Sequence, residues 1–420
     1  MTEQLLQYLW HHKLIKAQNL VDTQGFAVKI LNFGTWNTNA GPDFLLAKIE
    51  YQGLILVGHI EFHLRSSDYL KHQHQHNPQY DNLILHAVYE HDETIEVLAQ
   101  KNIPTIALKP YIDGATLNKY QKMMTAQQGI PCEGLFDKNK IPPLFSDELL
   151  LKKLDEKATQ IEHALTQTKN DYEAVLFRYL AYAFGLKINA EIFQQLAEGL
   201  DFSIINKVRQ RQTQLEALFF GLCGWLEKPE DPEMGIWKRE FDFLKAKYQL
   251  PERLVSPLFL RLRPPNFPTI RLSQLAHLYA THQHLFSKVI EAQNLNDLYT
   301  IFQPISASAY WDKHYTFGKT TPEEKPKKLS AAFIHLILIN AVLPLRYAYF
   351  KNQKENISDD ILNFYQEIPA EHNSIITYWK RLGVHFQSAK DTQAFLFLKK
   401  IFCNHKKCLT CSIGYQLLKP

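Results

Sequence analysis

The sequence has few cysteines, little net charge and almost no long apolar run, and each shortage excludes a class of protein. Five cysteines in 420 residues are too few for a secreted disulfide scaffold. A formal net charge of +4 does not by itself identify a nucleic-acid binder. The first residues, Met1–Gln4, include an acidic side chain and no basic cluster, unlike a signal peptide. We therefore expect a globular protein of the cytoplasm.

The one membrane-like run covers Phe333–Phe350. It contains His335, Asn340, Pro344 and Arg346, which would be costly in lipid, and its uninterrupted apolar part is too short to span a bilayer. Proline also interrupts a regular helix, because it lacks an N–H and its ring clashes with the preceding turn. The run therefore predicts a buried helix that is broken near Pro344, and no membrane partner.

The remaining sequence divides by its pattern. Residues 1–122 combine one helical pattern with several short strand-like runs, which predicts an α/β domain. Residues 123–145 contain turn signals such as Ile141-Pro142-Pro143 and predict a connector. Residues 146–420 have helical patterns almost throughout and show no repeat of fixed period, so they predict a mainly α-helical domain.

The first domain is expected to begin with a helix over Thr2–Lys13, where apolar side chains recur at helical spacing. A short helix near Ser66–His72 is expected to start at the serines, whose hydroxyls can cap it. The strand-like runs are Phe26–Phe33, Phe44–Tyr51, Leu54–Leu64, Leu83–His91, Ile95–Ala99 and Pro104–Leu108.

A group of ionisable residues coincides with two of these runs. Apolar and polar residues alternate from His59 to Arg65, so Glu61, His63 and Arg65 share one face of the predicted strand. Asp43 directly precedes the run Phe44–Tyr51. Gly53 marks a tight turn between this run and Leu54–Leu64. We therefore expect a hairpin that brings Asp43 close to Glu61.

Two neighbouring carboxylates are suited to a divalent cation, because Mg²⁺ and Mn²⁺ prefer oxygen ligands. We expect Asp43 and Glu61 to hold the cation, His63 to position or activate water, and Arg65 to bind the phosphate. The chemistry that this set predicts is phosphodiester hydrolysis.

At these residues the sequence resembles the PD-(D/E)XK nuclease superfamily. Pro42-Asp43 matches the first motif, and Glu61-Phe62-His63 matches Glu-x-Lys with histidine in place of lysine. The resemblance implies a mixed central sheet with flanking helices, in the order helix, hairpin, helix, strand. It also implies a Mg²⁺- or Mn²⁺-dependent nuclease acting on DNA or RNA, with Glu3 as an accessory ligand from the first helix.

Histidines are concentrated in the same stretch. The segment from His72 to His76 is expected to contact substrate phosphates or position water through His72, His74 and His76. Alternatively, His72, His74, Asp81 and His86 could bind zinc, since imidazole and carboxylate suit that ion. Seven of the 18 histidines in the chain fall between positions 59 and 91. They are His59, His63, His72, His74, His76, His86 and His91.

Cysteines form a second candidate site. Cys403, Cys408 and Cys411 have C-x4-C-x2-C spacing, and Cys132 lies in a turn-like segment far upstream. Clustered thiols in a cytosolic chain indicate metal ligands. The four thiols predict a structural zinc or a [4Fe–4S] cluster, with His405 as an alternative fourth ligand for zinc.

A third candidate contains three arginines. Arg261, Arg263 and Arg271 flank a proline-rich stretch with Phe267, which predicts an extended segment. Arginine can bind phosphates while an aromatic ring stacks on an unpaired base, so we expect the segment to contact nucleic acid. Salt bridges made by an ordered connector are the alternative.

Several blocks together resemble an uncharacterised bacterial family of domains of unknown function, of the 2851 type. They include Asn39-Ala40-Gly41-Pro42-Asp43-Phe44, Arg261-Leu262-Arg263-Pro264 and the C-terminal cysteines, so the resemblance covers nearly the full length. It implies no activity.

The function expected from the residues is therefore a metal-dependent nuclease. One alternative is a noncatalytic nucleic-acid-binding module, since His63 replaces the lysine of the nuclease motif. Another is a zinc-dependent hydrolase of a small substrate, built on the histidine segment.

Overall fold

The computed structural model describes residues 1–127 and 129–419. Two compact units are present. Unit 1 comprises Met1–Phe145, Arg381–Val384 and Leu398–Pro420, and unit 2 comprises Ser146–Lys380 and His385–Phe397. Unit 1 contains a mixed sheet with helices, and unit 2 is mostly helical, as the sequence predicted.

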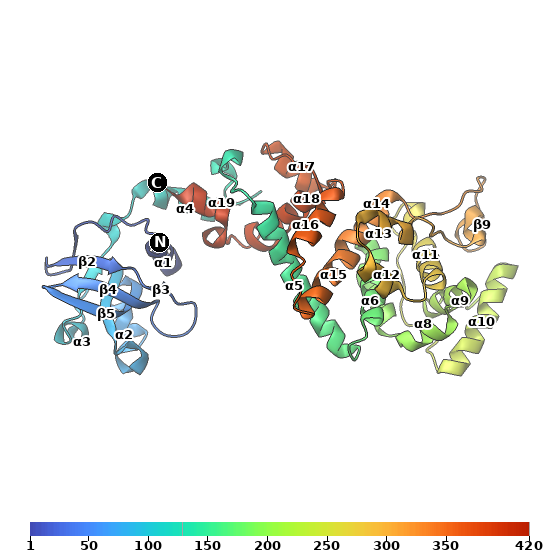
Figure 1. Ribbon diagram of the computed structural model, residues 1–420, viewed down its shortest axis with the longest axis horizontal. Coiled ribbons are helices and arrows are strands. Elements are labelled where there is room, and N and C mark those ends of the chain that lie inside the picture. Colours follow the sequence, from blue (N-terminus) through green and yellow to red (C-terminus); the bar gives the residue numbers. More distant parts are fainter. Residues whose placement is uncertain (128, 420) are drawn as a thin grey trace. The chain divides into compact units, whose positions relative to one another are not determined.

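Unit 1 is built on a sheet of seven strands within the described residues, in the order β1-β2-β4-β5-β6-β7 with β3 beside β4 (Figure 1). The strands β2, β4 and β5 are antiparallel neighbours, whereas β6 runs parallel to β5 and β7 parallel to β6. Their bounds are β1 (Leu20–Val21), β2 (Ala27–Asn32), β3 (Thr35–Trp36), β4 (Phe44–Tyr51), β5 (Leu54–Arg65), β6 (Leu83–Glu90) and β7 (Thr105–Ala107).

The first helix covers the apolar side of β5. Thr2 caps α1 by accepting from the Leu5 N–H, and the Trp10 ring packs edge-on against Phe62, with centroids 5.3 Å apart. On the other side of β5, Tyr69 of α2 packs edge-on against the His63 ring. The helices of unit 1 are α1 (Glu3–His11), α2 (Asp68–Lys71), α3 (Glu96–Gln100), α4 (Gly114–Thr125) and α19 (Ser412–Leu418), with short turns of helix η1 (His74–His76), η2 (Pro78–Tyr80), η3 (Lys109–Tyr111), η4 (Glu133–Leu135), η5 (Lys138–Lys140), η9 (Leu398–Cys403) and η10 (Cys408–Thr410).

Two local predictions in unit 1 were wrong. The run Ile95–Ala99 is not a strand but enters α3, because Ile95 and Leu98 are buried at helical rather than alternating spacing. The serines before α2 do not cap it. Ser66 and Ser67 hydroxyls donate to Asp92 instead, which ties this turn to the end of β6.

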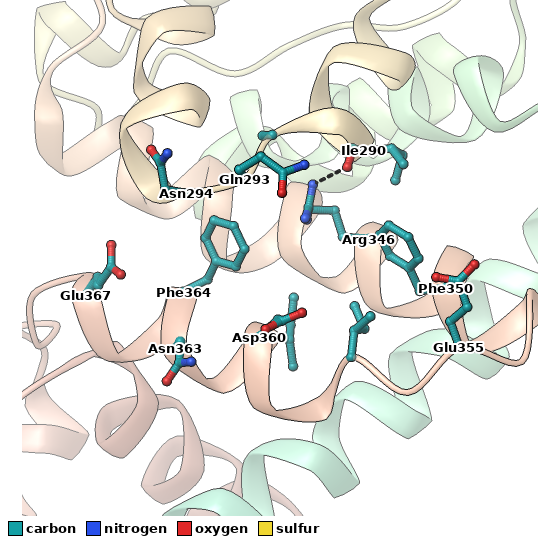
Figure 2. A pocket seen from close by; sticks show the side chains of 13 residues that line it. Ile290, Gln293, Asn294, Arg346, Phe350, Glu355, Asp360, Asn363, Phe364 and Glu367 are labelled. Carbon is teal, nitrogen blue, oxygen red and sulfur yellow. Dashed lines mark hydrogen bonds between the residues drawn. The ribbon is translucent and has the colours of Figure 1, made fainter.

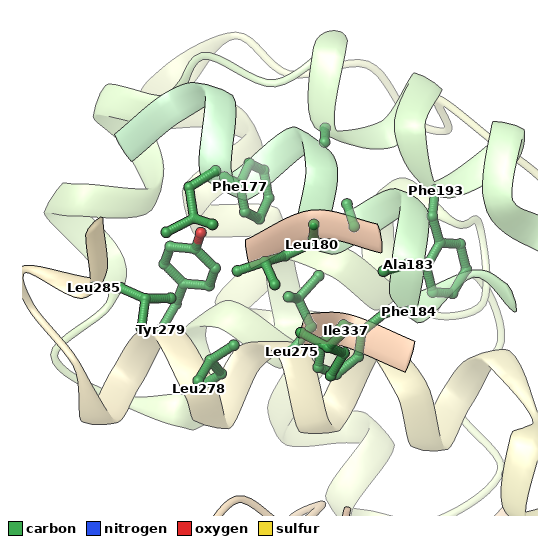
Figure 3. Close-up of a cluster of buried hydrophobic side chains, with 14 of the residues drawn as sticks. Phe177, Leu180, Ala183, Phe184, Phe193, Leu275, Leu278, Tyr279, Leu285 and Ile337 are labelled. Atoms are coloured by element: carbon green, nitrogen blue, oxygen red, sulfur yellow. The ribbon is translucent and has the colours of Figure 1, made fainter. Parts of the chain in front are cut away.

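Unit 2 has one continuous apolar core. Figure 3 shows Phe177, Leu180 and Phe184 of α6 facing Leu275 and Tyr279 of α11. The helices are α5 (Phe145–Gln167), α6 (Tyr172–Phe184), α7 (Leu186–Glu198), α8 (Phe202–Val208), α9 (Gln212–Leu222), α10 (Pro232–Tyr248), α11 (Pro268–Thr281), α12 (Leu285–Glu291), α13 (Leu295–Phe302), α14 (Ala331–Ile337), α15 (Leu343–Asn352), α16 (Ser358–Glu367), α17 (Ser374–Arg381) and α18 (Ala389–Phe397), with a small hairpin of β8 (His314–Thr316) and β9 (Lys319–Thr320).

The apolar run around Pro344 forms a helical segment over Ala331–Asn352, long and apolar enough to cross a membrane. However, 72% of its most apolar window is buried inside the protein, as in a core helix. The predicted break at Pro344 is absent. A π-helical turn, η8 (Leu338–Val342), precedes the proline and changes the hydrogen-bond register, so that α14 and α15 continue through it.

Candidate metal-binding site

The two carboxylates predicted to be neighbours are joined by hydrogen bonds. The Asp43 N–H donates to Glu61 Oε2 at 3.1 Å, and the Phe62 N–H donates to Asp43 Oδ2 at 2.9 Å. This exchange follows from the pairing of β4 with β5, in which Phe44 lies opposite Ile60. The Gln7 side chain of α1 donates to Asp43 Oδ1 at 2.8 Å. Helix and hairpin thus fix both carboxylates.

Both carboxylates hold their protons unusually tightly. Burial, and then the charge of Glu61, raises the pKa of Asp43 to about 7. Burial, with a smaller contribution from Glu3, raises the pKa of Glu61 to about 8, against the bond from the Asp43 N–H. A cation between them would offset both the burial and the repulsion, so the pair is suited to a positive ligand.

Three histidines lie close together beside Glu61. The ring nitrogens of His63, His72 and His74 lie within 4.8 Å of one another. His63 Nε2 is 3.2 Å from His72 Nδ1, and His74 Nε2 is 3.2 Å from Glu61 Oε1. His63 comes from β5, His72 directly follows α2, and His74 begins η1. We call His63, His72, His74 and Glu61 the imidazole cluster.

A buried chain orients the His63 ring from behind. His63 Nδ1 lies 3.0 Å from His86 Nε2, and His86 Nδ1 lies 3.4 Å from the Thr105 hydroxyl oxygen. This chain can keep the ring proton of His63 on Nδ1, which leaves the Nε2 lone pair directed into the imidazole cluster. Such a partner on the second nitrogen is typical of metal-binding histidine.

The charge of His63 differs from that of the lysine it replaces. Burial, together with His86, His74 and His72, lowers the pKa of His63 to about 2. The ring is therefore neutral near pH 7 and is a poor base in the metal-free protein. This environment favours His63 as a ligand rather than as the residue that activates water.

Other residues predicted for the site lie apart from it. Arg65 and His76 are exposed, and no hydrogen bond or ion pair joins either side chain to the carboxylates within the described part of the chain. The Asp81 side chain is 72% exposed and faces Lys101. His86 contacts His63 from behind instead of facing the cluster. His72, His74, Asp81 and His86, the predicted zinc ligands, therefore do not face one common point.

The site also includes residues that the sequence did not identify. Gln7 holds Asp43, and the Tyr80 ring stacks on His74 with centroids 4.1 Å apart. Glu3, which the resemblance suggested as an accessory ligand, accepts from the Leu64 N–H and interacts electrostatically with His72 and His74. Glu3 and Gln7 are four residues apart on one helix, and this spacing could have linked them.

Comparison with known proteins identifies the family. Residues 3–374 match the family described as "Protein of unknown function (DUF2851)". The chain belongs to this family. No curated protein and no solved structure matches it. The predicted membership in this family is confirmed, and since the family has no assigned activity, function must be argued from the residues.

The four predicted cysteine ligands of this DUF2851 chain lie near one another in unit 1. Burial, then Cys408 and Cys411, raises the pKa of Cys132 to about 12. Burial, then the other three thiols, raises the pKa of Cys403 as well. The carbonyls of the C-terminal segment accept from α4 side chains, at 3.4 Å from Thr116 and 2.9 Å from Lys119. This docking joins the two parts of the cysteine set.

The arginine segment of unit 2 is only partly as predicted. Arg261 and Arg263 are exposed. Arg271 lies in α11, is 6% exposed, and donates to Gln274 and Asn266 at 2.9 and 2.6 Å. The helix begins at Pro268, because proline suits the first helical turn, where its missing N–H is not needed. Arg271 is therefore buried and bonded within unit 2, and it is not displayed on an extended segment.

Unit 2 also contains a cavity of about 460 Å³ (Figure 2). Arg346 points into it between Phe350 and Phe364, and its guanidinium donates to the carbonyls of Val289 and Ile290, the latter at 2.8 Å. Main-chain acceptors thus hold the principal cation of this cavity in place. The convergence of metal-binding donors is found instead in unit 1.

Proposed function

We propose that unit 1 is a metal-dependent phosphodiesterase that cleaves DNA or RNA, with Asp43 and Glu61 as the carboxylates that hold Mg²⁺ or Mn²⁺. The observation that carries the proposal is the pair itself, in which half-buried Asp43 directly before β4 lies beside buried Glu61 of β5 and both pKa values are raised. A divalent cation is the ligand that would relieve this pair.

The order of elements supports the same chemistry. Helix α1 is followed by the antiparallel strands β2, β4 and β5, then by α2 and by β6 parallel to β5. This is the order that the PD-(D/E)XK resemblance implies. A fold alone does not specify an activity, so the argument depends on the carboxylates at the matching positions.

The residues around the carboxylate pair orient it and adjust its charge. A bound divalent cation would activate water and neutralise charge on the phosphate. Gln7 and the Phe62 N–H orient Asp43, and the Asp43 N–H orients Glu61. His63 acts as a neutral ligand or contact, and Glu3 adds negative charge at the edge of the site.

The cysteine set is assigned a structural role. We propose that Cys132, Cys403, Cys408 and Cys411 bind a [4Fe–4S] cluster or zinc, since four thiolates suit either. Metal binding would replace the thiol protons that burial now retains. The bound group would fasten the C-terminal segment to η4 and α4 within unit 1.

A noncatalytic nucleic-acid-binding module is the second candidate. The observation that favours it is the neutral, buried His63 at the position of the cationic lysine. Such a module would retain nucleic-acid binding without cleavage.

Cleavage assays distinguish these functions. The full chain would be tested with single- and double-stranded DNA and RNA, in Mg²⁺ or Mn²⁺. Asp43→Asn and Glu61→Gln should each reduce cleavage by roughly 10³-fold, as expected when several kcal/mol of metal-dependent stabilisation are lost. Glu50→Gln, on the exposed part of β4, is the matched control.

No cleavage by the wild type in either ion, with nucleic-acid binding retained, would support the noncatalytic module. Cleavage that survives both substitutions would exclude this site as the catalytic one.

A further inference from the structure

The imidazole cluster has the geometry of a metal site of its own. His74 Nε2 is buried and has no hydrogen-bond partner among the described residues, although Glu61 Oε1 lies only 3.2 Å away. A buried nitrogen without a partner is costly, and a cation between His74 and Glu61 would satisfy both atoms.

The distances fit one ion. In a tetrahedral site with bonds of about 2.0–2.1 Å, neighbouring donor atoms lie about 3.3 Å apart. His63 Nε2 is 3.2 Å from His72 Nδ1 and 3.8 Å from Glu61 Oε1, while Glu61 Oε1 is 3.2 Å from His74 Nε2. The three imidazole donors thus lie within 4.8 Å of one another, with Glu61 Oε1 beside two of them, and a bound ion would draw the four donors closer together.

We propose that His63, His72, His74 and Glu61 bind a first-row transition cation, Mn²⁺ or Zn²⁺. Three imidazoles favour such a cation over Mg²⁺, which takes oxygen ligands. Glu61 is shared with Asp43, so the proposal refines the metal requirement of the proposed function, on which its catalytic meaning rests. The binding claim itself does not depend on any reaction.

The surroundings support a prepared site. The chain from Thr105 through His86 fixes the His63 ring, and the Tyr80 ring holds His74 by stacking. His72 is exposed, which gives the ion a path from solvent. Orientation on one side and access on the other are what an exchangeable metal site requires.

Mn²⁺ titration of the metal-free full chain tests the proposal, because thiolates of the cysteine set bind this ion poorly. Free Mn²⁺ would be followed by electron paramagnetic resonance, and imidazole nitrogens on the bound ion by electron spin-echo modulation. The wild type should bind Mn²⁺ and show the nitrogen signal.

His72→Gln and His74→Gln should each weaken Mn²⁺ binding at least about tenfold, and together they should reduce the nitrogen signal to that of the one remaining imidazole, His63. Both positions lie in a surface segment, and circular dichroism would confirm folding. His76→Gln is the matched control, since His76 is exposed on the same turn, and should leave binding unchanged.

Unchanged affinity in the His72 and His74 variants, with binding lost in Asp43→Asn, would overturn the proposal and leave the ion with the carboxylates alone. Absence of Mn²⁺ binding by the folded wild type would also overturn it. Nitrogen-coordinated Mn²⁺ without any cleavage would uphold the site and reject the nuclease function.

Discussion

The two units bury ionisable side chains in different ways. In unit 2, Arg271 has polar partners in Gln274 and Asn266, and its guanidinium lies 3.5 Å from the centre of the Phe333 ring. Buried Glu216 likewise accepts from the Ser273 hydroxyl. The protein supplies these partners itself.

In unit 1, by contrast, groups of the same kind lie together: two carboxylates and three imidazoles. Asp43 and Glu61 share a negative environment, and ring nitrogens of His63, His72 and His74 lie within 4.8 Å of one another. Buried groups with fixed partners stabilise a fold, whereas converging groups without enough partners indicate a ligand. In these examples the two sites differ in whether the protein itself supplies a partner for the charged group, and not in residue type.

The largest effect is expected from the cysteine set, whose buried thiols would be stabilised by a bound metal. Cys403→Ser should remove stoichiometric iron or zinc and lower the free energy of unfolding of unit 1 by about 3 kcal/mol or more, because metal binding contributes directly to folding. Metal analysis after anaerobic purification and hydrogen exchange of each unit would measure both effects.

Cys223→Ala is the control for the cysteine set, since Cys223 lies in the core of unit 2. It should keep the metal and cost only about 1 kcal/mol. Equal metal content in Cys403→Ser and wild type would remove the structural role of the set.

Arg271 tests whether a buried charged group with partners stabilises unit 2. Arg271→Ala should destabilise unit 2 by about 2–4 kcal/mol, through lost hydrogen bonds, lost packing on Phe333 and a cavity. Chemical denaturation would measure the change. Arg263→Ala, which is exposed, should stay within about 0.5 kcal/mol. Weakened nucleic-acid binding with normal stability in Arg271→Ala would instead assign the residue to substrate.

The carboxylates of unit 1 should make metal-free stability depend on pH. Since the pKa values of Asp43 and Glu61 are raised to about 7 and about 8, the folded state holds protons that the unfolded state has released. The free energy of unfolding should therefore fall as pH rises from about 4.5 to 8, by up to ~1.4 kcal/mol per pH unit for each group, and the slope should fade as pH passes the folded-state pKa values.

Thermal unfolding across this pH range would measure the slope. Glu61→Gln should make it shallower and Mn²⁺ should largely remove it, whereas Glu50→Gln should not change it. A metal-free protein whose stability is constant over this range would show that the pKa values of Asp43 and Glu61 are not raised.

The smallest expected effect concerns the exposed arginines of unit 2. Arg261→Ala and Arg263→Ala should each weaken nucleic-acid binding and reduce the salt slope of log K by about 1, if each contacts one phosphate. Binding isotherms at several salt concentrations would measure it. An unchanged slope would leave these arginines without a role in binding.

Local pattern was enough to predict several features. Period-two alternation identified β5, and the motif residues before β4 and within β5 identified the carboxylate pair. These succeed because a hairpin is a local structure, so that sequence spacing fixes which side chains become neighbours.

Other predictions failed where distant packing decides the structure. Arg271 was expected in an extended segment, but burial against Phe333 and a helix start at Pro268 place it inside α11. Pro344 was expected to end a helix, but the core of unit 2 retains the segment through a π-turn. At Pro344 burial outweighed the local preference, whereas at Pro268 the proline itself favours the start of the helix that carries Arg271.

The sequence by itself determined the class of each unit, the hairpin with Asp43 and Glu61, and the supply of histidines and cysteines. Only the tertiary structure decided which histidines meet. His63 belongs to β5, while His72 and His74 reach it because α2 and η1 fold over that strand, and Asp81 points to solvent on the same segment. Spacing along the chain determines which residues are neighbours within a helix, strand or hairpin. Contacts between separate segments depend on how the loops pack, and no periodic pattern in the sequence predicts that packing.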